Sequence, residues 1–142
     1  MELLIIVGLF AVVVAMAVPQ LQSTLSGERL VTSIDNLAAE LNMARTLSVS
    51  RNATYEIRID TSAGTYQIID TEDPGNPPRG MKQLDPGISL GNVPTTPIRF
   101  FSRGYSTGGS VVLVSVSGNS CSLTVNRSGH VQVGDIRSYE TQ

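Results

Sequence analysis

The chain of 142 residues has no tryptophan, one cysteine, one histidine and a net charge of only −2. The single cysteine, Cys121, excludes an intrachain disulfide and a cysteine-rich metal site. The small acidic net charge argues against a general polyanion-binding protein, because such domains usually carry a basic surplus. The 41% hydrophobic content argues against a disordered chain. The length suits one domain with an appended segment.

Residues that could support catalysis or metal binding do not form a recognisable motif. His130 has no Gly-x-Ser-x-Gly or Cys–His arrangement that would make it the base of a nucleophile. Four carboxylates could suggest a calcium site, but their spacing matches no calcium-binding loop. These are Asp70, Glu72, Asp73 and Asp85. We therefore expect no enzyme activity, no cofactor and no metal site, and we expect Cys121 to be a small core residue.

The N-terminal segment is an unbroken apolar run over residues 3–18, headed by Glu2 and closed by Pro19. As a helix these residues span roughly 24 Å, against a bilayer core of about 30 Å, so their length fits a signal-peptide core or a short membrane span. No basic residues precede the run, and residues 20–25 continue as a helix rather than opening a mature domain. A carboxylate in such a segment costs about 2.5–3.5 kcal/mol near a bilayer centre, which predicts that Glu2 pairs with another group.

The next segment has the period of an amphipathic helix. Apolar residues recur at steps of three or four: Leu30, Ile34, Leu37, Leu41, Ala44 and Leu47. Polar residues are expected on the opposite face: Thr32, Ser33, Asp35, Asn36, Glu40 and Arg45. One helix is therefore predicted from Glu2 to about Ser50, and Pro19 is expected to kink or loosen it.

The remainder of the chain has the two-residue period of strands, interrupted by glycine and proline. Seven strands are predicted, at residues 55–59, 66–68, 88–90, 98–101, 111–116, 122–125 and 130–133. The predicted fold is α+β: a long N-terminal helix, apolar and then amphipathic, packed on an antiparallel β domain of about seven strands in two sheets, with the helix laid against one of them. The expected regions are an apolar membrane or filament-core helix at 1–25, an amphipathic helix at 26–52 and a globular β domain at 53–142.

The order Glu2, apolar run, Pro19 resembles the N-terminal segment of the type IV pilins and type II secretion pseudopilins. That resemblance implies a subunit of a membrane-rooted filament, in which Glu2 pairs with the N-terminal amine of a neighbouring subunit during assembly. It also implies a short leader, removed by prepilin peptidase, and a few mature residues ahead of Met1.

Later segments resemble the minor pseudopilins of the GspH/FimT branch. They are the helix-to-strand passage at 41–52, the strand ending in Gly104, and the pair of strands around the Gly129 turn. The resemblance implies a minor pilin or pseudopilin in the bacterial inner membrane, with one membrane span and its globular domain in the periplasm. Its expected partners are other minor and major pilins and the inner-membrane assembly platform, and its expected place is the filament tip. The anchor is common to type II secretion and type IV pili, so both systems stay open.

The alternative function is DNA binding for natural transformation, because some members of this branch bind DNA through arginines in a Gly-Arg-x-Arg motif. The matching residues here are Gly129, His130, Val131 and Gln132, so both arginines are absent. The arginines that remain available for weak contacts are Arg99, Arg103, Arg127 and Arg137. Four phosphate contacts at most would give weak, salt-sensitive binding, so nucleic acid is not expected as a partner.

Overall fold

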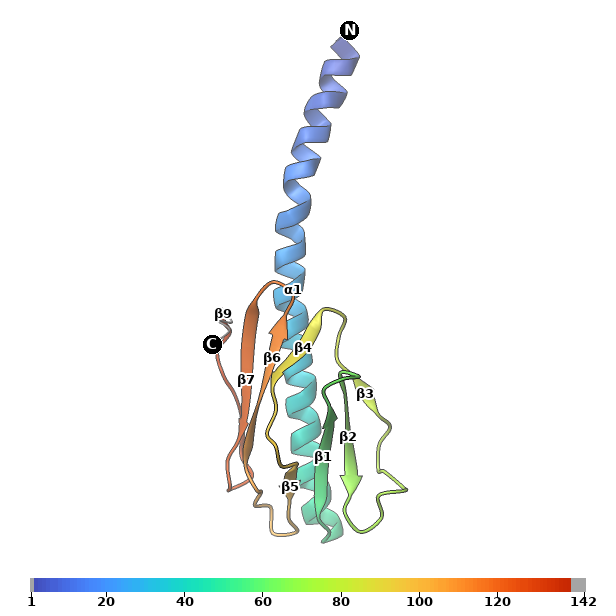
Figure 1. Ribbon diagram of the computed structural model, residues 1–142, viewed down its shortest axis with the longest axis vertical. Helices are drawn as coiled ribbons and strands as arrows, with labels where there is room; N and C mark the ends of the chain where they lie inside the picture. The colour runs from blue at the N-terminus through green and yellow to red at the C-terminus, as the bar shows by residue number, and fades with distance from the viewer. Residues whose placement is uncertain (1, 139–142) are drawn as a thin grey trace.

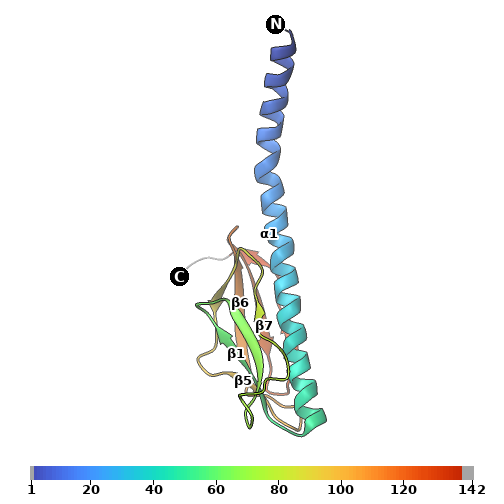
Figure 2. The ribbon, with the colours of Figure 1, turned by 90° about the vertical axis from the view of Figure 1, so that its right-hand side faces the viewer.

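The computed structural model describes residues 2–138, with side chains at residues 7–8 and 27–138. Its first element is the helix α1, Glu2–Arg51, which is continuous through Pro19 and Gly27. The first half of α1 projects away from the rest of the molecule, and the second half lies along the sheets (Figures 1 and 2). No helix in the described part of the chain is long and apolar enough to cross a membrane. Nearly all side chains of the predicted anchor, residues 3–18, lie outside that part.

The helix ends where Asn52 adopts a left-handed conformation, with φ of 52°. Asparagine tolerates this conformation better than most residues, so it can take the place that glycine usually occupies after a helix. The amide of Ala53 then donates a hydrogen bond to the carbonyl oxygen of Ser48, 3.2 Å away. This turn directs the chain into the first strand.

Within residues 2–138, nine antiparallel strands form two sheets behind which α1 lies (Figure 1). The first sheet has the order β3-β2-β1-β5, with β1 Tyr55–Asp60, β2 Thr65–Asp70, β3 Lys82–Gln83 and β5 Ile98–Phe100. The second has the order β4-β6-β7-β8, with β4 Ile88–Asn92, β6 Gly109–Ser115, β7 Asn119–Val125 and β8 Val131–Val133. A ninth strand, β9 Arg137–Ser138, also pairs with β7. The predicted α+β fold is confirmed, with two short strands, β3 and β9, added to the seven expected. We call the β domain, residues 53–138, the head.

The core lies between α1 and the inner faces of both sheets. On α1, the side chains of Leu30, Ile34, Leu37, Leu41 and Ala44 are at most 1% exposed. They meet alternate residues of the strands, such as Val111 and Leu113 of β6 and Leu123 of β7. Burial of each large side chain contributes about 1.5–3 kcal/mol, which makes this stripe the main attachment of the head to the helix.

One detail of the predicted packing is wrong. The helix was expected to lie against one of the two sheets, but α1 contacts strands of both: β1 and β5 of the first, and β4, β6, β7 and β8 of the second. The buried apolar stripe is about four turns long, so one sheet of short strands would leave part of it exposed. Figure 2 shows both sheets on the same side of α1.

Candidate assembly surfaces

The residues predicted to act in assembly, Glu2 and Pro19, both lie in the first half of α1. Their side chains are outside the described residues, so the pairing of Glu2 and the role of Pro19 in assembly stay predictions. The backbone alone shows that no other described helix or strand lies beside this half of α1 (Figures 1 and 2). The head therefore leaves the first half of the helix open along its length.

The second half of α1 carries two buried polar residues that the sequence placed on the solvent face. Ser33 is 2% exposed and donates a hydrogen bond to the Asp85 carboxylate, Oγ to Oδ2 2.6 Å. Glu40 is 4% exposed and forms salt bridges with Arg79, 3.1 Å, and Lys82, 2.7 Å. The expectation that Ser33 and Glu40 face solvent is wrong, because the segment between β2 and β4 folds over this side of the helix.

These contacts tie the helix to the loop that follows β2. Residues 71–81 join β2 to β3, and this loop is rich in proline and glycine. The Glu40 carboxylate forms salt bridges with Arg79, near the end of the loop, and with Lys82, the first residue of β3. The two cations are 44% and 42% exposed, so water still solvates them while the carboxylate they share is buried. The ion pair therefore joins α1 to the edge of the first sheet.

At the far end of the head, two loops meet the last turns of α1. The Arg45 Nε donates a hydrogen bond to the carbonyl oxygen of Gly104, 3.2 Å away. Gly129 has φ of 77°, and a Cβ at this position would collide with the same Gly104 oxygen. A glycine is therefore required at 129 for the loop 101–108 and the turn 126–130 to pack together on the helix.

The four arginines considered for DNA contact do not share one surface. Arg99 is bonded to the buried Glu56, Nε to Oε2 3.0 Å. Arg137 lies in β9, opposite Ser120 near the start of β7, whereas Arg127 lies two residues beyond the last residue of that strand. Seven residues of strand separate them by roughly 20 Å. Only Arg103 and Arg127 lie in loops that pack together.

Glu56 is the centre of a second buried ion pair. Its carboxylate is 4% exposed and accepts hydrogen bonds from Arg58, at Oε1, and from Arg99, at Oε2. Burial alone would raise the pKa of Glu56, but the hydrogen bonds and charges of the two arginines outweigh it and lower the pKa below 4.5. The carboxylate therefore stays ionised and holds both guanidinium groups on the outer face of the first sheet.

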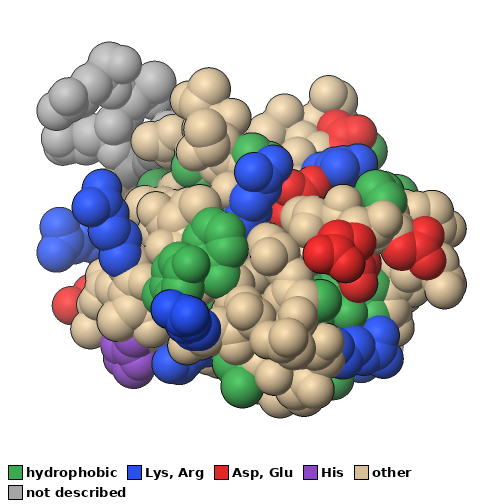
Figure 3. All heavy atoms as spheres, turned by 90° about the horizontal axis from the view of Figure 1, so that it is seen from below, with side chains coloured by type: hydrophobic (Ala, Val, Ile, Leu, Met, Phe, Trp, Pro, Cys, Tyr) green, Lys and Arg blue, Asp and Glu red, His purple; other side chains and the backbone are tan. Residues whose placement is uncertain are grey.

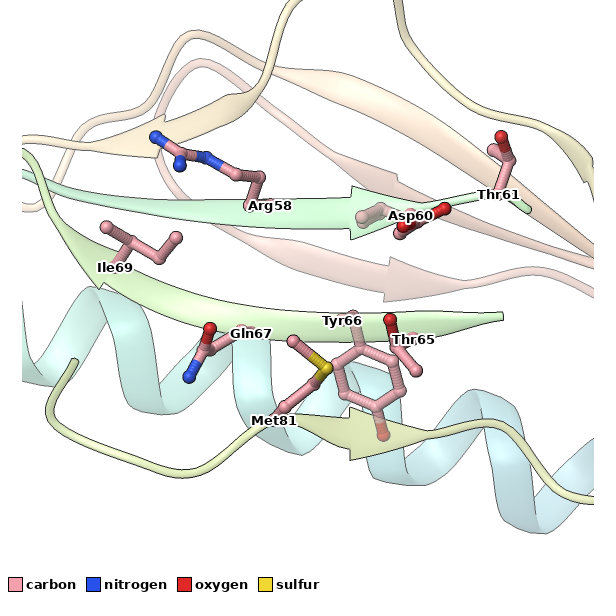
Figure 4. A pocket seen from close by; sticks show the side chains of 9 residues that line it. Arg58, Asp60, Thr61, Thr65, Tyr66, Gln67, Ile69 and Met81 are labelled. Carbon is pink, nitrogen blue, oxygen red and sulfur yellow. The ribbon is translucent and has the colours of Figure 1, made fainter. Parts of the chain in front are cut away.

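An open hollow of about 400 Å³ lies on that outer face, lined by residues of β1, β2 and the turn between them, together with Met81 (Figure 4). Its polar groups are used in local structure. Asp60 accepts hydrogen bonds from the amides of Ser62 and Ala63, which lower its pKa, with Ala63 the larger cause. Arg58 is bonded to Glu56. The hollow thus presents a turn carboxylate and a structural arginine rather than an acid–base pair.

The remaining candidates have structural surroundings. Cys121 is 3% exposed in the core, its thiol donates to the carbonyl oxygen of Gly134 at 3.1 Å, and burial is the main reason that its pKa is raised. His130 is exposed at the start of the segment that leads into β8. Among the side chains that the structure describes, no three His, Cys, Asp or Glu residues are grouped so that they could hold a metal ion.

The chain is similar to one protein family over most of its length. The model of the family described as "Type II transport protein GspH" matches residues 33–129. That range includes most of the amphipathic half of α1, the first sheet, and strands β4, β6 and β7 of the second sheet. Among curated proteins, no sequence matches the chain.

Solved structures with the same fold include two minor subunits. The minor pseudopilin EpsH of the Type 2 Secretion System of Vibrio cholerae has 12% sequence identity and a TM-score of 0.63, over 74% of this chain and 95% of that one. The type IV minor pilin FimU of Pseudomonas aeruginosa has 16% identity and a TM-score of 0.63, over 76% of this chain and 90% of that one. At such identities the likeness shows the fold alone.

Proposed function

Because the chain belongs to the GspH family of type II transport proteins, we propose that it is a minor pilin-like subunit that helps to start a membrane-rooted filament. One observation carries this proposal: a helix of 50 residues whose first half is free of the head and whose second half forms one side of its core. A free apolar helix needs lipid before assembly and neighbouring helices after it. A filament subunit passes between these two surroundings.

In this proposal the two halves of α1 have different tasks. The first half, with Glu2 at its start, anchors the subunit in the inner membrane and then packs in the filament core with major and minor subunits. The second half holds the head in the periplasm. Prepilin peptidase processes the chain, and the inner-membrane assembly platform adds it to the filament tip. Its work is assembly rather than catalysis, whether the filament serves protein secretion or a pilus.

The salt bridges of Glu40 and the buried stripe support the same role. A head that swung freely on its helix could not set the position of the next subunit. Glu40 and the buried stripe fasten the head to α1 over about four turns, so displacement of the helix would displace the head with it.

The experiment is to express a tagged copy from the chain's own locus, shear filaments from the cells and measure the copy by quantitative mass spectrometry. We expect it in the filament fraction at far lower abundance than the main subunit, and we expect deletion of its gene to reduce the number of filaments. A chain found only outside that fraction, with unchanged filament numbers after deletion, would contradict the proposal. The control is a tagged copy without residues 2–25, which keeps the head.

A further inference from the structure

Three segments meet at the end of the head that is remote from the N-terminus: the last turns of α1, the loop 101–108 and the turn 126–130. Arg45 of α1 binds the loop at Gly104, and the amide of Ser106 donates to the carbonyl oxygen of Arg127 at 2.9 Å. In the end-on view of Figure 3, basic side chains flank a hydrophobic group in the left half, whereas most acidic side chains lie in the right half. The three segments therefore form one continuous basic surface.

An exposed aromatic pair lies on this surface. Phe101 and Tyr105 stack with ring centroids 4.6 Å apart, and Tyr105 is 48% exposed. The amide of Phe101 donates to the carbonyl oxygen of Tyr105 at 2.9 Å, which holds the two residues in place. An aromatic ring that is exposed in a fixed position offers contact to a flat apolar surface, such as the C–H face of a sugar ring.

Three arginines of the same surface are not paired with a carboxylate in the described part of the chain. None of the salt bridges found there uses Arg45, Arg103 or Arg127. Arg103 and Arg127 are also exposed to solvent. A guanidinium group binds a carboxylate through two parallel hydrogen bonds, so a ligand that fits this surface must bring anionic groups.

The last turns of α1 add a row of hydrogen-bond acceptors. A hollow of about 410 Å³ is lined by Arg45, Val49 and the polar residues Asn42, Thr46 and Ser50. The hydroxyl groups of Thr46 and Ser50 donate to helix carbonyl oxygens, at 2.9 Å and 3.3 Å. These hydroxyls can therefore only accept hydrogen bonds from a ligand, and Asn42 adds its amide oxygen. The three side chains are spaced one helical turn apart, over about 12 Å.

This combination of groups favours a glycan that carries carboxylates over other anions. A sugar strand presents hydroxyl donors at regular intervals to the row of oxygens, ring faces to the aromatic pair and carboxylates to the arginines. The phosphodiester backbone of DNA offers only acceptors, so it would leave the row of oxygens without donors. An acidic protein loop supplies carboxylates, but it has no repeating unit to match acceptors that recur at each helical turn.

We propose that this end of the head binds a carboxylated glycan strand, and that the strand is the cell-wall polymer of the periplasm. That polymer consists of N-acetylated sugars with lactyl and peptide carboxylates. In the proposed orientation this end is the part of the head farthest from the inner membrane, so it meets the wall as a filament begins to extend. The inference rests on the proposed function and adds a ligand to it. We call Asn42, Arg45, Thr46, Arg103, Tyr105 and Arg127 the glycan surface.

The first experiment compares two insoluble glycans. The full chain in lipid nanodiscs is sedimented with cell-wall sacculi that protease and nuclease have freed of protein and nucleic acid, at about 150 mM salt. Chitin, a polymer of N-acetylated sugars without carboxylates, is the matched probe. We expect half-saturation at about tenfold lower concentration on sacculi than on chitin, because only sacculi supply partners for the arginines. Equal binding to both glycans, or no sedimentation with sacculi, would overturn the inference.

The row of acceptors has a matched pair of variants, Thr46→Val and Thr32→Val. Both threonines are exposed on α1, and each donates to the carbonyl oxygen four residues earlier, at 2.9 Å and 3.0 Å. Thr46→Val should weaken binding to sacculi by about threefold, because one hydrogen bond to the glycan is lost, whereas Thr32→Val should leave binding unchanged. If the two changes have the same effect, α1 does not bind the strand and the inference fails.

The arginines are tested by Arg103→Gln combined with Arg127→Gln, with Arg29→Gln as the control on an exposed part of α1 outside the glycan surface. The double change should weaken binding to sacculi by about tenfold or more, and the chain should still enter filaments at the normal level. Loss from filaments with unchanged binding to sacculi would make this surface a contact between subunits and overturn the inference. A chain that binds no sacculi yet enters filaments loses the glycan surface and keeps the proposed function.

Discussion

The buried ion pair at Glu40 gives the most quantitative test of how the head is held on the helix. Glu40→Gln removes the charge but keeps the size of a side chain that is 5% exposed. Hydrogen bonds to charged groups contribute roughly 1.5–3 kcal/mol each, but the amide oxygen can still accept one bond, and Arg79 and Lys82 are exposed enough to regain water. We expect a loss of about 2 kcal/mol in the free energy of unfolding. At about 4 °C per kcal/mol for a domain of this size, the Tm should fall by about 8 °C.

The measurement is urea and thermal unfolding of the fragment 26–142, followed by circular dichroism. Glu28→Gln is the matched control, because Glu28 lies on the same helix, is exposed and forms no salt bridge among the described residues. Its effect should stay within about 0.5 kcal/mol. If Glu40→Gln lowers the free energy of unfolding no more than Glu28→Gln does, the Glu40 ion pair does not hold the loop to the helix.

Three further outcomes follow from the same structure. The fragment 26–142 should be soluble and monomeric and should unfold cooperatively, because the α1 residues found in the core, among the side chains that the structure describes, begin at Leu30. A molten state by near-ultraviolet circular dichroism would refute this. Because the pKa of Glu56 is lowered in the folded state, its contribution to stability is present above pH 4.5 and is lost as the pH falls through the folded pKa. The loss of unfolding free energy caused by Glu56→Gln, measured in urea, should therefore disappear in acid. A loss that stays constant from pH 7 to pH 3 would exclude this role. The fragment should show flat DNA titrations at about 150 mM salt; micromolar binding that charge reversal at Arg103 and Arg127 abolishes would instead favour the uptake function.

The parts of the fold that follow from local periodicity could be predicted from the sequence. The spacing from Leu30 to Ala44 places those residues on one side of a helix whatever they pack against, and their burial is confirmed. The alternation in β6 and β7 likewise predicts which residues face the core. Strands of two residues, such as β3 and β9, are too short to show a period, so their pairing appears only in the folded chain.

The parts that depend on contacts between distant segments could not be predicted in this way. Glu40 has the spacing of a solvent-facing residue, and its burial depends on Arg79 and Lys82, which lie some 40 residues later. The separation of Arg137 from Arg127 follows from the way β9 returns to the start of β7. The sequence does show two basic residues, Arg79 and Lys82, at the end of a loop rich in proline and glycine. It does not show that Glu40 is the acidic residue with which they pair.

The central claim is that the chain works by inserting its first helical half into a filament, and Glu2 tests it most directly. Glu2→Ala should be introduced at the chain's own locus and the amount of chain in sheared filaments compared with the membrane pool. Loss of a carboxylate paired in apolar surroundings should reduce incorporation by about tenfold or more, while the Tm of the head stays unchanged, because Glu2 lies far along α1 from the core. Normal incorporation of the Glu2→Ala chain would contradict the assembly role of this residue and the account built on it.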